Sequence, residues 1–374
     1  MPARPELIKP RRNTTTLKAR LGREAVKWAL ARFLRWSPVE DPEPGYTIIL
    51  GVPWDLRHLL PVNLRFVSQT DLDECYRIHV VFDRCGRPGA QQLIEDCRAS
   101  FPKLPLRFSF YPTAAGRIIE RVNVSTFYNS MNTTLALGEC RTRYAILHDF
   151  DLYPLVPDYF RAVVEAMRER DLRFCGLEYT FFEHLTEEDR LLGTWCLGID
   201  VPWLRQTQQP IDCFHRVARV NGRLVSLDPF SWVQMRTARR DLVRSLDGSA
   251  CCHVNNLCST YLRFVNRQWA RIVWRLHYVW YLEKLAGDGR HFELALQTME
   301  EAQGPVLDID SYDVDFNGTD PTCANVLRDE LRKMETFLFG RSRADVEAYV
   351  DAFEGFLHRI AESVARTALV GASN

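Results

Sequence analysis

The chain has 374 residues, of which 46% are hydrophobic and 26% are charged, as expected of a globular protein with one large or two modest domains. Its 48 Lys and Arg residues are balanced by 48 Asp and Glu residues, so we expect no nucleic-acid partner. No run approaches the ~18 apolar residues of a membrane-spanning helix, so any membrane contact is expected to be peripheral.

The N-terminal 36 residues form a basic arm with ten Lys or Arg residues and two Glu residues. Residues 17–36 lack proline and gather apolar side chains on one side of a helical wheel, so they are predicted to form an amphipathic helix. A basic helix with Trp and Phe can lie at the inner face of a membrane, or it can pack on the protein's own core. A proline-rich linker follows, so residues 1–44 form the first region.

Strand and helix patterns alternate in the next part of the chain. Apolar runs typical of strands lie at 46–52, 76–83, 106–111 and 144–147, and helical patterns lie at 91–101 and 118–137. Residues 64–69 fit either a strand or a short helix. This alternation predicts an α/β fold with a mostly parallel sheet flanked by helices.

Acidic residues follow two of these strands. Asp83 ends the second strand, and Asp149 and Asp151 come directly after the strand at 144–147. Side chains two residues apart on an extended chain point the same way, so the two carboxylates repel unless a cation lies between them. A hard divalent metal with oxygen ligands fits that position, at the strand ends where α/β sheets bind ligands. The alternative is a polar exit from the strand, where Asp is common in turns.

The remainder of the chain becomes increasingly helical. Predicted elements are a helix at 158–170, strands at 173–179 and 194–199, a hairpin at 217–227 around Asn221-Gly222, and helices at 229–246, 263–285, 292–303, 325–338 and 342–367. Asp228 is a candidate N-cap for the helix at 229–246. The acidic segment 308–320 is predicted to be a solvated loop. Residues 45–260 are therefore predicted to form the catalytic domain, and residues 261–374 a helical C-terminal region.

The 11 cysteines are odd in number and scattered along the chain. None forms the Cys-x-x-Cys pair of a zinc ribbon. We therefore expect most of them to be reduced and buried, which is typical of cytoplasmic proteins.

The order of these features over roughly 46–253 resembles the GT-A-fold glycosyltransferases that use nucleotide sugars. The resemblance rests on the first strand, a second strand ending in Asp83, a helix with Asn129 and Asn132, and a strand ending in Asp149-Phe150-Asp151. It implies an α/β GT-A fold and transfer of a sugar from a nucleotide-diphosphate donor to a hydroxyl acceptor, such as an envelope, capsule or lipid-linked glycan.

The resemblance also implies roles for individual residues. Asp149 and Asp151 would bind Mn²⁺ or Mg²⁺ and the diphosphate, and Asp83 would contact the nucleobase or ribose. His253 is the best match for a third metal ligand, with His215 as its rival. Arg84, together with Arg141 and Arg143 near predicted strand ends, could pair with phosphates, and the alternative for each of them is ordinary surface charge.

An inverting reaction needs a general base for the acceptor hydroxyl. Asp228 is the first candidate, and its alternative role is the helix N-cap described above. Glu178 and Glu183 are the next candidates.

Two other functions compete with this prediction. The protein could be a non-catalytic GT-A-like protein that binds nucleotide sugars. Strand-Asp-x-Asp also opens haloacid-dehalogenase-like phosphatases, where the first Asp is the nucleophile. Leu152-Tyr153-Pro154 and the three preceding strands argue against the phosphatase.

Overall fold

The structure is a computed structural model, and it describes residues 17–83, 88–122, 125–177, 179–180, 190–220, 223–242, 250–268 and 272–372. The chain divides into two compact units. Among the described residues, the sheet unit comprises those within 17–57 and 70–251, and the helical unit comprises those within 58–69 and 252–372. The boundaries predicted at 44 and 260 stay predictions.

The sheet unit is built on seven strands, in the order β12-β6-β9-β4-β1-β2-β3. Their bounds are β1 Glu43–Val52, β2 Cys75–Phe82, β3 Leu106–Phe110, β4 Thr142–Asp149, β6 Phe174–Gly176, β9 Cys196–Asp200 and β12 Arg240–Leu242. Every strand runs in the same direction except β9, which is antiparallel to β4 and β6. The predicted mostly parallel sheet is therefore confirmed.

The strand order reverses between β1 and β4. β2 and β3 continue on one side of β1, whereas β4 lies on its other side. Ligands of open α/β sheets bind beyond the carboxyl ends of the strands at such a reversal.

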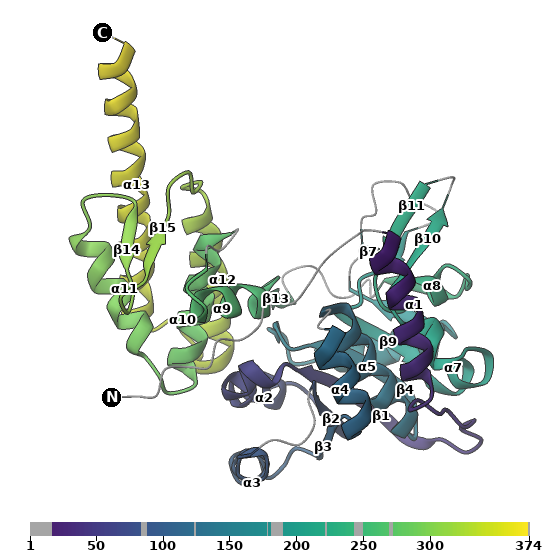
Figure 1. The fold of residues 1–374 in the computed structure, drawn as a ribbon. Helices are drawn as coiled ribbons and strands as arrows, with labels where there is room; N and C mark the ends of the chain where they lie inside the picture. The colour runs from purple at the N-terminus through teal and green to yellow at the C-terminus, as the bar shows by residue number, and fades with distance from the viewer. Residues whose placement is uncertain are drawn as a thin grey trace. The chain divides into compact units, whose positions relative to one another are not determined.

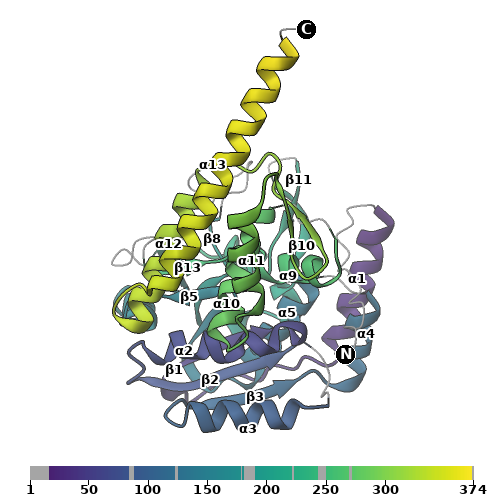
Figure 2. The same ribbon diagram turned by 90° about the vertical axis from the view of Figure 1, so that its left-hand side faces the viewer.

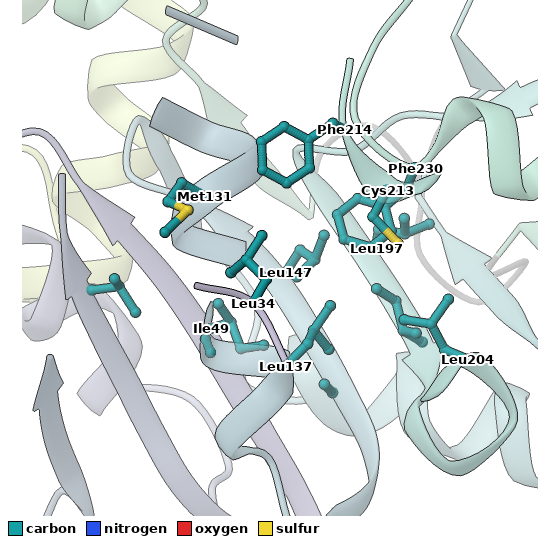
Figure 3. Close-up of a cluster of buried hydrophobic side chains, with 14 of the residues drawn as sticks. Leu34, Ile49, Met131, Leu137, Leu147, Leu197, Leu204, Cys213, Phe214 and Phe230 are labelled. Atoms are coloured by element: carbon teal, nitrogen blue, oxygen red, sulfur yellow. The ribbon is translucent and has the colours of Figure 1, made fainter. Parts of the chain in front are cut away.

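Helices cover both faces of this sheet. α1 (Leu17–Ala31), α4 (Thr113–Val122) and α5 (Ser125–Glu139) share one apolar cluster with the strands, part of which is drawn in Figure 3. In that view Ile49 and Leu147 of neighbouring strands lie near Met131 and Leu137 of α5. The amphipathic helix predicted near the N-terminus is confirmed in α1, which Figure 1 shows beside α4 and α5.

The opposite face carries α6 (Tyr159–Glu169). A Cβ atom on Gly198 of β9 would lie 2.7 Å from side-chain atoms of both Val163 and Met167 in α6. Glycine at this position thus allows the helix to pack closely on the strand. α3 (Ala90–Ser100) lies beside β3, where the Arg98 guanidinium sits 5.6 Å from the Phe108 ring centroid.

Smaller elements complete the sheet unit. They are β5 Leu152–Pro154, β7 Tyr179–Thr180, β8 Leu191–Leu192, α7 Val201–Thr207, the 3-10 helix η3 Pro210–Cys213, β10 Arg216–Val220, β11 Arg223–Leu227 and α8 Ser231–Gln234. The antiparallel pairing of β10 and β11 confirms the predicted hairpin. The 3-10 helix η1 (Trp54–Leu59) and β13 (Cys251–His253) each cross a boundary between the units.

The helical unit confirms the predicted helical C-terminal region. It contains α2 Leu60–Ser68, α9 Leu257–Val265, the 3-10 helix η4 Val273–Arg275, α10 Leu276–Leu285, α11 Arg290–Glu301, α12 Cys323–Phe339, α13 Ala344–Ala372 and the hairpin strands β14 Val306–Asp308 and β15 Asp313–Asp315. Phe66 of α2 stacks on Phe337 of α12, and Phe292 of α11 stacks on Tyr349 of α13. Figure 2 shows α11 and α13 side by side.

Several predicted elements differ from the structure. The helix predicted at 118–137 is divided into α4 and α5. Of the two alternatives for 64–69, the structure has the helix, because α2 extends to Ser68. The solvated loop predicted at 308–320 contains the β14–β15 hairpin, whose turn places Asp310 and Ser311 at positive φ.

The helix predicted at 229–246 is also wrong, because α8 ends at Gln234. The Arg240 side chain donates to the carbonyls of Gln234 and Thr237, which a longer helix would have satisfied through its own backbone. The long helix predicted at 263–285 is interrupted, because α9 ends at Val265 and α10 begins at Leu276. Arg267 takes φ 53° and donates to the carbonyls of Asp310 and Ser311.

None of the described helices combines the length and apolar character that a membrane span requires. The ten cysteines among the described residues form no disulfide.

Candidate active site

Two carboxylates lie together at the carboxyl end of β4. Asp149 is the last residue of the strand, where its N–H donates to the Trp195 carbonyl at 2.9 Å. Asp151 follows directly before β5. One carboxylate oxygen of each residue lies within 4.8 Å of the other. Both residues are half-buried, whereas Phe150 between them is 6% exposed. The buried ring anchors the turn and leaves both acids accessible.

This pair fits a hard divalent cation. Mg²⁺ binds oxygen at ~2.0–2.1 Å, so two ligands on opposite sides of the ion are about 4.2 Å apart. The spacing between the two carboxylates therefore allows one ion to contact both. Other ligands would have to come from water, from a phosphate or from elsewhere in the chain.

The two candidate histidines belong to different parts of the chain. His253 is the last residue of β13 and belongs to the helical unit, so its role as a third ligand stays a prediction. His215 is 4% exposed. Its ring Nε2 is 2.8 Å from the Ser226 hydroxyl, and its backbone N–H donates to the Ser130 hydroxyl. The described residues contain no three-ligand cluster that includes His215.

Asp83 is buried at the end of β2. Its N–H donates to the Val52 carbonyl at 3.1 Å, and its carboxylate accepts the Trp54 N–H at 2.8 Å. These bonds fix the turn after β1. The Trp54 ring packs edge-on against Phe82 and carries the Arg57 guanidinium 4.7 Å from its centroid. The predicted nucleobase or ribose contact of Asp83 stays a prediction, and Arg84 lies outside the described residues.

Gly51 of β1 lies between the end of β4 and α5. It pairs with Asp149 across the sheet, and a Cβ atom at this position would lie 2.8 Å from Nδ2 of Asn132. Asn132 is 4% exposed, and its Oδ1 has no hydrogen-bond partner among the described residues. The resemblance placed Asn132 in a helix before β4 and predicted no contact with Gly51. A polar residue within an otherwise apolar stretch of helix was the available signal.

The candidate bases lie after β11 or outside the described residues. Asp228 follows β11 and is exposed, yet partial desolvation among the surrounding protein atoms raises the pKa of its carboxyl group above the ordinary value. The N-cap role predicted for it is wrong, because Phe230 occupies that position before α8. Glu178 and Glu183 lie outside the described residues.

Arg141 and Arg143, which were predicted as possible phosphate partners, lie at the amino end of β4. Arg141 precedes the strand and Arg143 is its second residue, so both belong to the edge opposite Asp149. The Arg143 guanidinium is 3.6 Å from Asp171 and 3.8 Å from Asp200. Neither side chain therefore lies beside Asp149, and the ion pairs of Arg143 fit the alternative of ordinary surface charge.

No protein-family model matches the sequence, and no curated protein matches it. Solved structures show distant likeness. TarS 1–349 from S. aureus has 11% identity and a TM-score of 0.38, over 83% of this chain and 90% of that chain. Mannosyltransferase PcManGT from Pyrobaculum calidifontis, in complex with GDP-Man and Mn²⁺, has 13% identity and a TM-score of 0.41, over 90% and 93%.

A third structure, galactosyltransferase LgtC in complex with donor and acceptor sugar analogs, has 13% identity and a TM-score of 0.34. The match spans 45% of this chain and 62% of that chain. All three TM-scores are below 0.5, so these likenesses establish neither the activity nor the substrates of this chain.

Proposed function

We propose that this chain is a metal-dependent GT-A glycosyltransferase, an enzyme that moves a sugar from a nucleotide-diphosphate donor to a hydroxyl acceptor. The observation that carries the proposal is the Asp149/Asp151 pair, at the carboxyl end of a central strand and beside the reversal of strand order. This is the position and chemistry that a metal–diphosphate site needs.

Each residue then has a defined task. Mn²⁺ or Mg²⁺ held by Asp149 and Asp151 supplies positive charge for the departing diphosphate. His253 would complete the ligand set. Asp83 fixes the turn after β1 and, with Arg84, lines the nucleoside side of the donor.

The acceptor side needs a proton acceptor. Asp228 is the first candidate and Glu178 the second. The raised pKa of Asp228 brings the basicity of its carboxylate closer to that required near neutral pH. A base must be deprotonated when it takes the proton from the acceptor hydroxyl.

We further propose that the enzyme acts at the cytoplasmic face of a membrane, on a lipid-linked or envelope glycan. The support lies in the two sides of α1. Leu30 of α1, and Leu34 shortly after the helix, are buried in the core of the sheet unit, whereas Trp28 of α1 is 68% exposed. The core packing predicted as an alternative thus describes one side of the helix, and the other side presents an aromatic ring to solvent.

A donor-hydrolysis screen over UDP- and GDP-sugars with Mn²⁺ or Mg²⁺ tests the enzyme. We expect nucleoside diphosphate release that requires metal and falls about 100-fold or more in Asp149→Asn and Asp151→Asn. Asp73→Asn is the matched control, because Asp73 is an exposed loop acid away from this strand end. Unchanged release in both site variants would contradict the proposal.

The same preparation separates the alternatives. Metal-dependent calorimetric binding of UDP or GDP without turnover would identify a non-catalytic binding protein. Release of phosphate from a generic aryl phosphate, with no sugar donor present, would identify a phosphatase.

A further inference from the structure

A pocket of about 680 Å³ opens at the amino ends of the central strands. All of its lining residues belong to the sheet unit. β4 runs from Thr142 to Asp149, so the pocket and the carboxylate pair lie at sheet edges about 23 Å apart. The volume falls within the ~300–1,000 Å³ typical of small-molecule sites. The pocket is therefore a separate candidate site.

Four arginines line it, and three of them come from β2, from β3 and from the residue before β4. Arg77 and Arg107 share a face of the sheet, since Arg107 pairs with His79, two residues after Arg77. Arg141 adds a third guanidinium just before β4. Among the described residues, no carboxylate lies within 4.0 Å of Arg77 or Arg141, and that of Glu139 is 3.7 Å from Arg107.

Other arginines near this edge are paired. Arg161 donates to Asp71 at 2.5 Å, and Arg168 donates to Glu74 at 2.7 Å. Arg77 and Arg141 thus differ from these neighbours, because no described carboxylate lies within 4.0 Å of either guanidinium.

Acidic side chains line the same pocket. Glu40, Asp41 and Glu43 come from the segment that enters β1. In the described part of the chain, none of them lies within 4.0 Å of a lysine, arginine or histidine nitrogen. Apart from the Arg107–Glu139 pair at 3.7 Å, the described charged groups of this cavity do not lie within 4.0 Å of a group of opposite sign, which leaves room for a molecule that offers partners to both.

The wall of the pocket is held in place by Arg205 of α7. Its guanidinium donates to the carbonyls of Ser37 at 2.6 Å, Cys140 at 2.8 Å and Leu137 at 3.2 Å. These bonds tie the segment that carries the acids to the end of α5. The site is therefore organised before any ligand arrives, which lowers the entropic cost of binding.

We propose that this pocket is a second ligand site, which binds a sugar-sized molecule bearing a phosphate or carboxylate group. Arg77, Arg107 and Arg141 bind the anion through charge-assisted hydrogen bonds. Glu40 and Asp41 accept hydrogen bonds from the ligand's hydroxyls. The inference does not rest on the proposed glycosyltransferase function.

Calorimetry tests it with four probes: glucose 6-phosphate, glucuronate, glucose and inorganic phosphate. The titrations use the Asp149→Asn/Asp151→Asn protein without added metal, so the proposed donor site does not contribute. We expect saturable binding of at least one anionic sugar, tighter than that of glucose or inorganic phosphate. If glucose 6-phosphate binds more tightly than glucuronate, the site prefers a phosphate group, and the opposite order indicates a carboxylate group.

Variants locate the binding. In the Asp149→Asn/Asp151→Asn protein, the further substitutions Arg77→Gln and Arg141→Gln should weaken the binding of anionic sugars about tenfold or more. Arg168→Gln in the same protein should leave this binding unchanged. The double substitution Glu40→Gln with Asp41→Asn should weaken the binding of the anionic sugar but not the binding of inorganic phosphate. Circular dichroism confirms that each variant is folded. Absence of saturable binding by both anionic sugars, or equal affinity in the arginine variant, would overturn the proposal.

Discussion

Gly51 lies beside the carboxyl end of β4 at a position where a Cβ atom would clash with the Asn132 side chain. We expect Gly51→Ala to destabilise the protein by about 1–3 kcal/mol, because the new Cβ would force Asn132 to move. Donor hydrolysis should fall as well, since Gly51 pairs with Asp149. Urea unfolding measures the stability. The control is Gly22→Ala on α1, where a Cβ would meet nothing within 4 Å.

A second substitution tests the cause of that loss. Adding Asn132→Ala to Gly51→Ala removes the obstructing amide, so part of the lost stability should return. If the double variant is no more stable than the sum of the two single changes predicts, the clash with Asn132 is not the cause.

Asp228 makes a prediction about pH. Its carboxyl pKa is raised by desolvation, and a general base works only when deprotonated. Transfer should therefore decline as pH falls through a pKa above ~3.9, the ordinary value for Asp. Asp228→Asn should lower the rate ~10²–10⁴-fold and remove this acidic limb of the pH profile. An unchanged profile in Asp228→Asn would assign the base to another residue.

At the scale of elements, apolar runs allowed correct prediction of the central strands because burial on both faces leaves a local signature. The two failed helices stop at contacts that no apolar pattern marks. After α8, the Arg240 side chain donates to the carbonyls of Gln234 and Thr237. After α9, Arg267 has a positive φ, and its side chain donates to the carbonyls of Asp310 and Ser311. The carboxylate pair was predictable because Asp149 and Asp151 are two residues apart. The Gly51–Asn132 contact was not, because it joins a strand to a helix far along the chain.

The outer side of α1 carries the membrane prediction. Trp28 is exposed, and so are Arg32 and Arg35 further along the same segment. Burying a large side chain contributes about 1.5–3 kcal/mol, so Trp28→Ala should weaken binding to anionic vesicles about tenfold or more. Co-sedimentation with phosphatidylglycerol vesicles measures this effect.

The matched control for that experiment is Phe339→Ala, because Phe339 is 41% exposed but lies at the end of α12. Neutral phosphatidylcholine vesicles should bind the wild type weakly, since the proposed contact is partly electrostatic. Equal sedimentation of the wild type and Trp28→Ala would exclude α1 as the contact.

At the scale of the molecule, equal numbers of acids and bases conceal local differences in charge. The chain as a whole is neutral, yet the pocket arginines at the amino edge and the acid pair at the carboxyl edge belong to one sheet. Because the central strands are parallel, all their amino ends lie on one side of the sheet and all their carboxyl ends on the other, and this separates the two groups. Composition alone could not have located either site.

Both units share a sensitivity to acid, because each contains a buried neutral histidine. Burial lowers the pKa of His79 in the sheet unit and of His277 in the helical unit to about 3. Arg77 and Arg107 add to the shift at His79. Unfolding restores each pKa to ~6.5, so the unfolded chain binds more protons between the two values. Stability should therefore fall with decreasing pH, by about 1.4 kcal/mol per pH unit for each histidine below pH ~6.5.

Isosteric variants isolate this effect from that of the carboxyl groups. The Nε2 of His79 is 2.7 Å from the Ser109 hydroxyl, so His79→Gln can preserve that contact. The Nδ1 of His277 is 2.6 Å from the Tyr349 hydroxyl, so His277→Asn can preserve it. Urea unfolding between about pH 4 and 7 should show a smaller pH slope in each variant. Substitution of the exposed His358 serves as the control. A pH dependence of the unfolding free energy equal to that of the wild type in His79→Gln and His277→Asn would contradict the prediction.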